Sequence, residues 1–78
     1  MNKGSNRNPG NYVVCIDNTD YTASLEKHKI YRVVGDEAAR DDGDLRVIDE
    51  SGEDYLYPAA RFVTISVPAE VEKSLALD

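Results

Sequence analysis

Five short runs of β-branched and aromatic residues, each bounded by turn-forming residues, constrain the fold of this chain more than any other feature. They occupy residues 12–16, 30–34, 45–48, 55–57 and 62–67. Runs of this composition favour β-strands, and no long helix is indicated between them. We therefore predict an all-β domain. A barrel is favoured over an open sheet, because closure leaves so small a sheet without a long exposed edge.

The connections between the runs carry signals of their own. Gly52 is expected to adopt the left-handed conformation that closes a bulged hairpin between the third and fourth strands. Pro58 should end the fourth strand because it has no N–H, and residues 58–61 are long enough for one 3-10 turn. Residues 37–40 indicate a helical turn, and Pro68 is suited to begin a short C-terminal helix. Residues 21–29 are interpreted as a long loop held on the core by Leu25, with Tyr21 as a second contact.

With 78 residues the chain has room for one domain. Residues 1–11 are polar and rich in asparagine and glycine, so we expect a disordered N-terminal tail. Residues 12–67 should form the barrel, and residues 68–78 a short C-terminal helix or tail. The predicted core draws on the centres of four strands, at Val33, Val47, Leu56 and Val63.

The composition offers little for catalysis or metal binding. Cys15 and His28 are the only cysteine and histidine, which excludes an internal disulfide and a zinc site built from those ligands. Cys15 lies within a predicted strand and is expected in the core rather than as a nucleophile. The aspartates at 41, 42 and 44 lack the spacing of a helix-loop-helix calcium site. We predict a protein that is not an enzyme, with no cofactor and no metal.

The chain contains no apolar stretch of the length that a membrane span needs. The first eleven residues include no apolar segment of the kind found in signal peptides. A single thiol is typical of a reducing compartment. The expected location is therefore the cytoplasm, without membrane association.

Residues 55–63, Tyr-Leu-Tyr-Pro-Ala-Ala-Arg-Phe-Val, resemble the end of a Src-homology-3 barrel, where a proline-led 3-10 turn precedes the last strand. The chain has no tryptophan, so binding of proline-rich peptides is not implied. It also resembles small bacterial and phage proteins of unknown function. That likeness rests on Cys15-Ile-Asp-Asn18, on Lys29, Tyr31 and Val33, and on a later run containing Ile48, Asp49, Gly52, Glu53, Tyr55, Tyr57 and Pro58. It implies a bacterial or phage source and a five-stranded Src-homology-3-like barrel, but no activity.

Acidity is concentrated in the middle of the chain. The net charge is −6, and residues 36–54 alone carry nine acidic and two basic side chains. Two interpretations remain open: the acids occupy solvated loops, or they form an electronegative face for a basic partner.

Two classes of function follow from these residues. The first is a non-catalytic protein- or peptide-binding module of bacterial or phage origin, with an aromatic surface at Tyr21, Tyr55, Tyr57, Arg61 and Phe62. In the alternative interpretation, the tyrosines belong to the core and the barrel rim. The second class is a nucleic-acid-related role, either by contact through Lys27, Lys29 and Arg32 or by an acidic surface that competes for basic proteins. The oligomeric state is left open.

Overall fold

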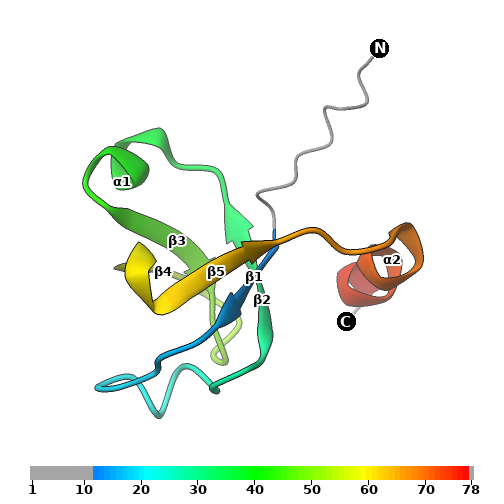
Figure 1. Ribbon diagram of the computed structural model, residues 1–78, viewed down its shortest axis with the longest axis horizontal. Coiled ribbons are helices and arrows are strands. Elements are labelled where there is room, and N and C mark those ends of the chain that lie inside the picture. Colours follow the sequence, from blue (N-terminus) through cyan, green and yellow to red (C-terminus); the bar gives the residue numbers. More distant parts are fainter. Residues whose placement is uncertain (1–11, 78) are drawn as a thin grey trace.

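The computed structural model describes residues 12–77, and within them five strands form one antiparallel sheet. The strands are β1 (Tyr12–Cys15), β2 (Ile30–Val34), β3 (Asp44–Ile48), β4 (Asp54–Pro58) and β5 (Phe62–Ile65). Helix α1 (Glu37–Asp41) lies between β2 and β3, the 3-10 turn η3 (Ala59–Arg61) between β4 and β5, and helix α2 (Ala69–Leu77) after β5 (Figure 1). All five predicted strands, the 3-10 turn and the C-terminal helix are confirmed. The predicted disordered tail, residues 1–11, lies outside the described residues.

Local chemistry explains why the elements begin and end where they do. Gly52 has a φ of +85° in the β3–β4 turn, and its N–H bonds the Asp49 carbonyl at 2.9 Å. This is the left-handed conformation expected there, which glycine adopts without a steric penalty. Helix α1 begins at an aspartate cap, because the Asp36 carboxylate accepts a hydrogen bond from the Ala39 N–H at 3.0 Å.

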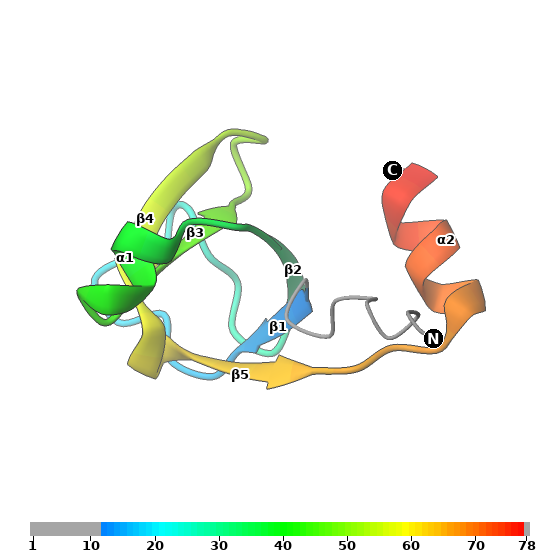
Figure 2. The ribbon, with the colours of Figure 1, turned by 90° about the horizontal axis from the view of Figure 1, so that it is seen from above.

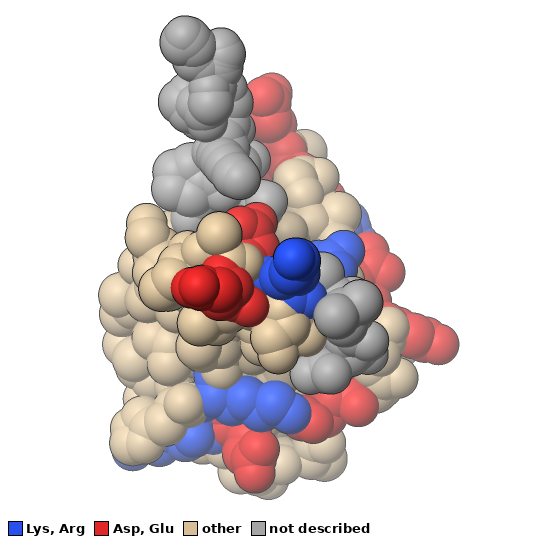
Figure 3. Space-filling view, turned by 90° about the vertical axis from the view of Figure 1, so that its right-hand side faces the viewer, with Lys and Arg blue, Asp and Glu red and all other residues tan. Residues whose placement is uncertain are grey.

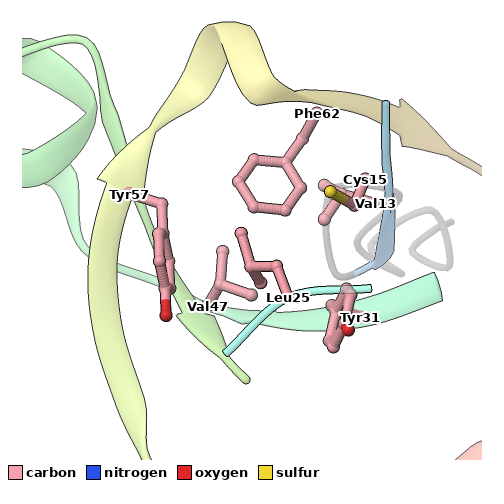
Figure 4. Close-up of a cluster of buried hydrophobic side chains, with 7 residues drawn as sticks. All are labelled: Val13, Cys15, Leu25, Tyr31, Val47, Tyr57 and Phe62. Atoms are coloured by element: carbon pink, nitrogen blue, oxygen red, sulfur yellow. The ribbon is translucent and has the colours of Figure 1, made fainter. Parts of the chain in front are cut away.

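The core occupies one face of the sheet, which we call the inner face. Side chains from β1 to β5 converge there around Leu25 (Figure 4). The buried cluster consists of Val13, Cys15, Leu25, Tyr31, Val47, Tyr57 and Phe62. Leu25 is only 1% exposed, although it belongs to the long loop between β1 and β2. The loop therefore supplies the centre of the core, and Tyr21 packs against it as predicted.

Two of the four predicted core residues are on the wrong face. Val47 is fully buried and Val33 packs against the cluster, but Leu56 is 48% exposed and Val63 is 46% exposed. In β4 the neighbouring Tyr57 is buried instead, and in β5 it is Phe62. Side chains of successive residues in a strand point to opposite faces of the sheet. A prediction that is wrong by one residue therefore assigns a solvent-facing side chain to the core.

The sheet curls but does not close into a barrel, which corrects the predicted closure. Its strand order is β4-β3-β2-β1-β5, so β4 and β5 are the two edges and are not paired with each other. Figure 2 shows how the sheet bends around the core. Turn η3 bridges the two edges: the Ala59 N–H bonds the Gly43 carbonyl at 2.9 Å, and the Arg61 carbonyl accepts from the Ile16 N–H at 2.9 Å.

Helix α2 follows Pro68, as expected for a residue that suits a first helical turn. Val71 on this helix is 39% exposed. No helix among residues 12–77 is both long enough and apolar enough to cross a membrane. The cytoplasmic location stays a prediction.

Candidate functional site

Four of the five residues of the predicted aromatic surface lie in one line of contacts from the surface to the core. The Arg61 guanidinium lies over the Tyr21 ring, 5.2 Å from its centroid. The Tyr21 and Tyr57 rings meet edge to face at 5.0 Å, and the Tyr57 and Phe62 rings follow at 6.1 Å. The structure therefore brings these four residues together near the long loop and η3, and Tyr55 is not part of this line.

Exposure differs sharply along this line. Tyr57 and Phe62 are core residues, 5% and 7% exposed, so their rings offer no surface. Arg61 is occupied as well, because one of its guanidinium nitrogens donates to the Thr19 carbonyl at 2.7 Å. Tyr55, by contrast, is 52% exposed on β4. The line of aromatic contacts thus holds the long loop on the core, and a binding role for Tyr21, Tyr55 and Arg61 stays a prediction.

A buried carboxylate joins the β3–β4 turn to β4, at a Tyr57 hydroxyl that also bonds the Ser24 hydroxyl of the long loop at 2.9 Å. Asp49 is 6% exposed and accepts a hydrogen bond from the Tyr57 hydroxyl at 2.5 Å. It also accepts from the Ser51 N–H and hydroxyl at 2.9 and 2.6 Å. Burial alone would raise the pKa of Asp49, but the hydrogen bonds from Ser51 and Tyr57 outweigh it and hold the pKa below its ordinary value. This carboxylate is therefore a structural anchor, charged at neutral pH.

A second network at the same end of the molecule occupies part of the predicted nucleic-acid contact. Lys29 and the Tyr31 hydroxyl both donate to Glu50, at 2.7 and 2.5 Å. Burial, then the bond to Glu50, raises the pKa of Tyr31 above its ordinary value. Lys29 is thus neutralised by an acid.

The remaining two residues of that contact, Lys27 and Arg32, are exposed and have no ion-pair partner in the described part of the chain. On the face toward α2, acidic and basic side chains are interspersed (Figure 3). No single basic patch forms on that face, and the nucleic-acid role stays a prediction.

The described residues include no group of three or more metal-ligating side chains. Cys15 is fully buried, as predicted for a core cysteine. His28 lies in a turn with a φ of +74° and is exposed.

A groove that the sequence did not indicate opens on the inner face, at the end of the sheet that carries α1. Its volume is about 450 Å³. Apolar side chains from β1, β2 and β3 line it, at Val13, Val33 and Leu45. Thr64 of β5 lines one side, and Glu37 and Arg40 of α1 also line it. We call this the inner-face groove. Figure 2 looks toward this end of the sheet, with α1 and β5 on different sides of it.

One side of the groove is also a free sheet edge. In the β1–β5 pair, the Ile16 N–H bonds the Arg61 carbonyl, so the backbone groups of Arg61 face β1. By the register, the backbone groups of Val63 and Ile65 face β1 as well. Hydrogen-bonded and non-hydrogen-bonded pairs alternate in an antiparallel ladder. The backbone N–H and C=O of Thr64 therefore point away from β1, and no further strand pairs with β5 among the described residues.

Two acidic and two basic side chains line the groove, Asp36 and Glu37 against Arg40 and Arg46. Arg46 is held between two carboxylates, Asp36 at 2.8 Å and Asp54 at 3.3 Å. The Ala39 N–H and the Arg46 guanidinium hold the pKa of Asp36 below its ordinary value. Sequence reasoning found the acidic segment but not that Asp36 and Glu37, at its start, line a groove with both polar and apolar walls. That position depends on how far the sheet bends. The alternation of apolar residues in β2 and β3 indicates which side chains share a face of the sheet, but not the extent of the bend.

No protein-family model, curated protein or solved structure matches this chain. A functional proposal therefore rests on the chain's own residues.

Proposed function

We propose that the protein is a non-catalytic binding module that takes up an extended segment of another protein along the inner-face groove, as a strand added to the edge of β5. The observation that carries the proposal is the coincidence of two features at one place. Thr64 presents backbone groups that no described strand pairs, and the same residue lines a groove whose half-buried apolar side chains are Val33 and Leu45.

Both features suit an extended peptide. A strand added to a sheet edge gains main-chain hydrogen bonds, and pockets that receive alternate side chains supply specificity. In an extended segment every second side chain points to the same face, so apolar residues at alternate positions would lie on the groove floor.

The proposal includes the finer fold. We take the curled sheet to be an opened form of a Src-homology-3-like barrel. The strand order, the long first loop with its buried leucine, and the 3-10 turn between the last two strands all support this assignment. In such a fold the edges at β4 and β5 do not pair, which leaves β5 available for an added strand.

The first test is selection of peptides from a random display library against the full chain, followed by synthesis of the selected peptide. Amide chemical shifts in a ¹⁵N-labelled sample should change at Thr64 and at Val33 and Leu45 when this peptide is added. A version of the peptide that is N-methylated at alternate residues should lose affinity, because it cannot donate to the Thr64 carbonyl.

The matched protein variants are Leu45→Lys in the groove and Leu56→Lys on the outer face of β4, where the leucine is 48% exposed. Only Leu45→Lys should abolish binding, with circular dichroism confirming that both variants fold. Shifts centred on Tyr55 or Arg61, equal loss in both variants, or failure to select any peptide would each contradict the proposal.

A further inference from the structure

We infer that a second copy of this chain pairs with the free edge of β5, so that the protein self-associates through an antiparallel β5–β5 contact. The self-association depends only on the properties of that edge. Its consequence rests on the proposed function, because the second copy would occupy the same edge as the bound peptide. Self-association would then mask the binding site until a peptide displaces the second copy.

The two free edges of the sheet are not equally protected against an added strand. On β4, Glu53 faces β3, because its carbonyl accepts a hydrogen bond from the Asp49 N–H at 3.1 Å. By alternation, the outward backbone positions of β4 are Asp54, Leu56 and Pro58. Asp54 is charged and Pro58 has no N–H, and charges and prolines are the features that keep natural edge strands from pairing.

Strand β5 carries neither protection. Its residues, Phe-Val-Thr-Ile, include no charged side chain and no proline. Thr64 points its N–H and C=O away from β1, and Ser66 occupies the next outward position along the chain. Pro68, which has no N–H, ends this edge on one side, and η3 ends it on the other. A short, uncharged and β-branched edge is thus left open to pairing with another chain.

The sequence of β5 is complementary to itself in an antiparallel register centred on Thr64. In this register the Thr64 residues of the two copies exchange N–H and C=O hydrogen bonds, since both groups point outward. Residue 62 of one copy then lies opposite residue 66 of the other. The Phe62 N–H already bonds the Ala59 carbonyl, but the Phe62 carbonyl can accept from the Ser66 N–H of the second copy. Both copies contribute the same groups, as a two-fold contact requires.

Apolar rows on the outer face of the sheet stop at this edge. Val14 lies opposite Ile30 on β2 and opposite Val63 on β5, so a row of β-branched side chains crosses three strands. Val63, the last member of the row, is 46% exposed. In the Thr64-centred register, Ile65 of the second copy lies opposite Val63 and continues the row. Cross-strand pairs of β-branched side chains stabilise a sheet, so the pairing covers an exposed apolar residue on each copy.

The size of this contact indicates a weak dimer. Stable protein–protein interfaces bury about 800 Å² on each partner, and one short edge pairing buries less. We therefore expect exchange between monomer and dimer over roughly 10 µM to 1 mM, and not an obligate dimer. A peptide that also fills the space beside Val33 and Leu45 would compete effectively with such a contact.

The experiment is sedimentation velocity of the full chain over that concentration range, in which the dimer fraction should rise with concentration. Val63→Lys should abolish the dimer. The matched control is Leu56→Lys on the outer face of β4, where the leucine is 48% exposed, and it should leave the dimer unchanged. Thr64→Pro removes an outward N–H and leaves the bonds to β1 in place, so it should also give a monomer. Circular dichroism checks that each variant folds.

A mixture of two variants tests the register. Ile65→Glu alone should be monomeric, because it places a charge at the edge. Mixed with Val63→Lys it should dimerise, since the Thr64-centred register brings the new lysine of one copy opposite the new glutamate of the other. A mixture that stays monomeric while both variants are folded would overturn this register.

Peptide competition separates this inference from the proposed function. The display-selected peptide should convert the dimer into peptide-bound monomer. A monomer at every concentration, a dimer that Val63→Lys weakens no more than Leu56→Lys does, or a dimer that persists while the peptide shifts Thr64 would each refute the β5–β5 contact and leave strand addition standing. A dimer with the expected variant pattern, together with no peptide shift at Thr64, would refute the proposed function alone.

Discussion

Replacing Tyr57 with phenylalanine tests whether the buried Asp49 carboxylate anchors the fold. The change removes one hydroxyl from a ring that is 5% exposed and leaves the packing against Tyr21 and Phe62 in place. Asp49 keeps its bonds from Ser51 but loses its donor at 2.5 Å. A hydrogen bond to a charged group contributes about 1.5–3 kcal/mol, so the free energy of unfolding should fall by that amount at pH 7. The corresponding fall in Tm is roughly 6–24 °C for a domain of this size.

The lowered pKa of Asp49 determines how the effect of Tyr57→Phe on stability should change with pH. The pKa of Asp49 is lowered in the folded protein, so its charged form contributes stability above the ordinary carboxyl pKa. That contribution is lost as pH falls through the folded-state pKa. Once Asp49 is protonated, the bond from Tyr57 joins two neutral groups and stabilises less. The difference between wild type and Tyr57→Phe should therefore be full at pH 7 and smaller at about pH 2, below the ordinary carboxyl pKa of about 3.9 and toward the lowered folded-state pKa of Asp49.

The assay is urea unfolding followed by circular dichroism at both pH values. Tyr55→Phe is the matched control, since it makes the same chemical change two residues away on a ring that is 52% exposed. It should leave the free energy of unfolding unchanged within about 0.5 kcal/mol, as for most surface substitutions. Equal destabilisation by the two variants, or a Tyr57→Phe effect independent of pH, would refute the role assigned to Asp49.

Two further substitutions test the core and the β3–β4 turn. Leu25→Ala empties the centre of the core, where the side chain is 1% exposed, and should cost about 2–5 kcal/mol, enough to unfold much of the protein; Leu56→Ala, at a residue 48% exposed, should cost far less in the same urea titration. Gly52→Ala places a side chain at a φ of +85° and should lower stability by about 1–2 kcal/mol, whereas Gly35→Ala meets no atom within 4 Å and has no positive φ, so its Tm should not fall comparably.

The local elements of this protein were determined by its sequence. Strands, turns and the 3-10 turn follow from residue types that act over a few positions: β-branched runs, Gly52 with its positive φ, and Pro58 without an N–H. The anchoring of the long loop by Leu25 was also predictable, because an isolated leucine in a mostly polar loop is stabilised by burial on the core.

The faces of the edge strands were decided by the tertiary structure. Both Leu56 and Tyr57 are apolar enough for a core, and so are Phe62 and Val63. Pairing of β4 with β3 and of β5 with β1 chose Tyr57 and Phe62, because Leu45 opposite Tyr57 and Cys15 opposite Phe62 already face inward. Register is a relation between distant segments, and local composition does not contain it.

Closure and the inner-face groove depend on the same long-range geometry. The acids of residues 36–54 were evident in the sequence, but the place of Asp36 and Glu37 beside Val33, Leu45 and Thr64 was not. That place follows from how far the sheet curls before η3 bridges its edges. Curl accumulates from the twist of every strand pair, so it is a property of the whole sheet and not of any one segment.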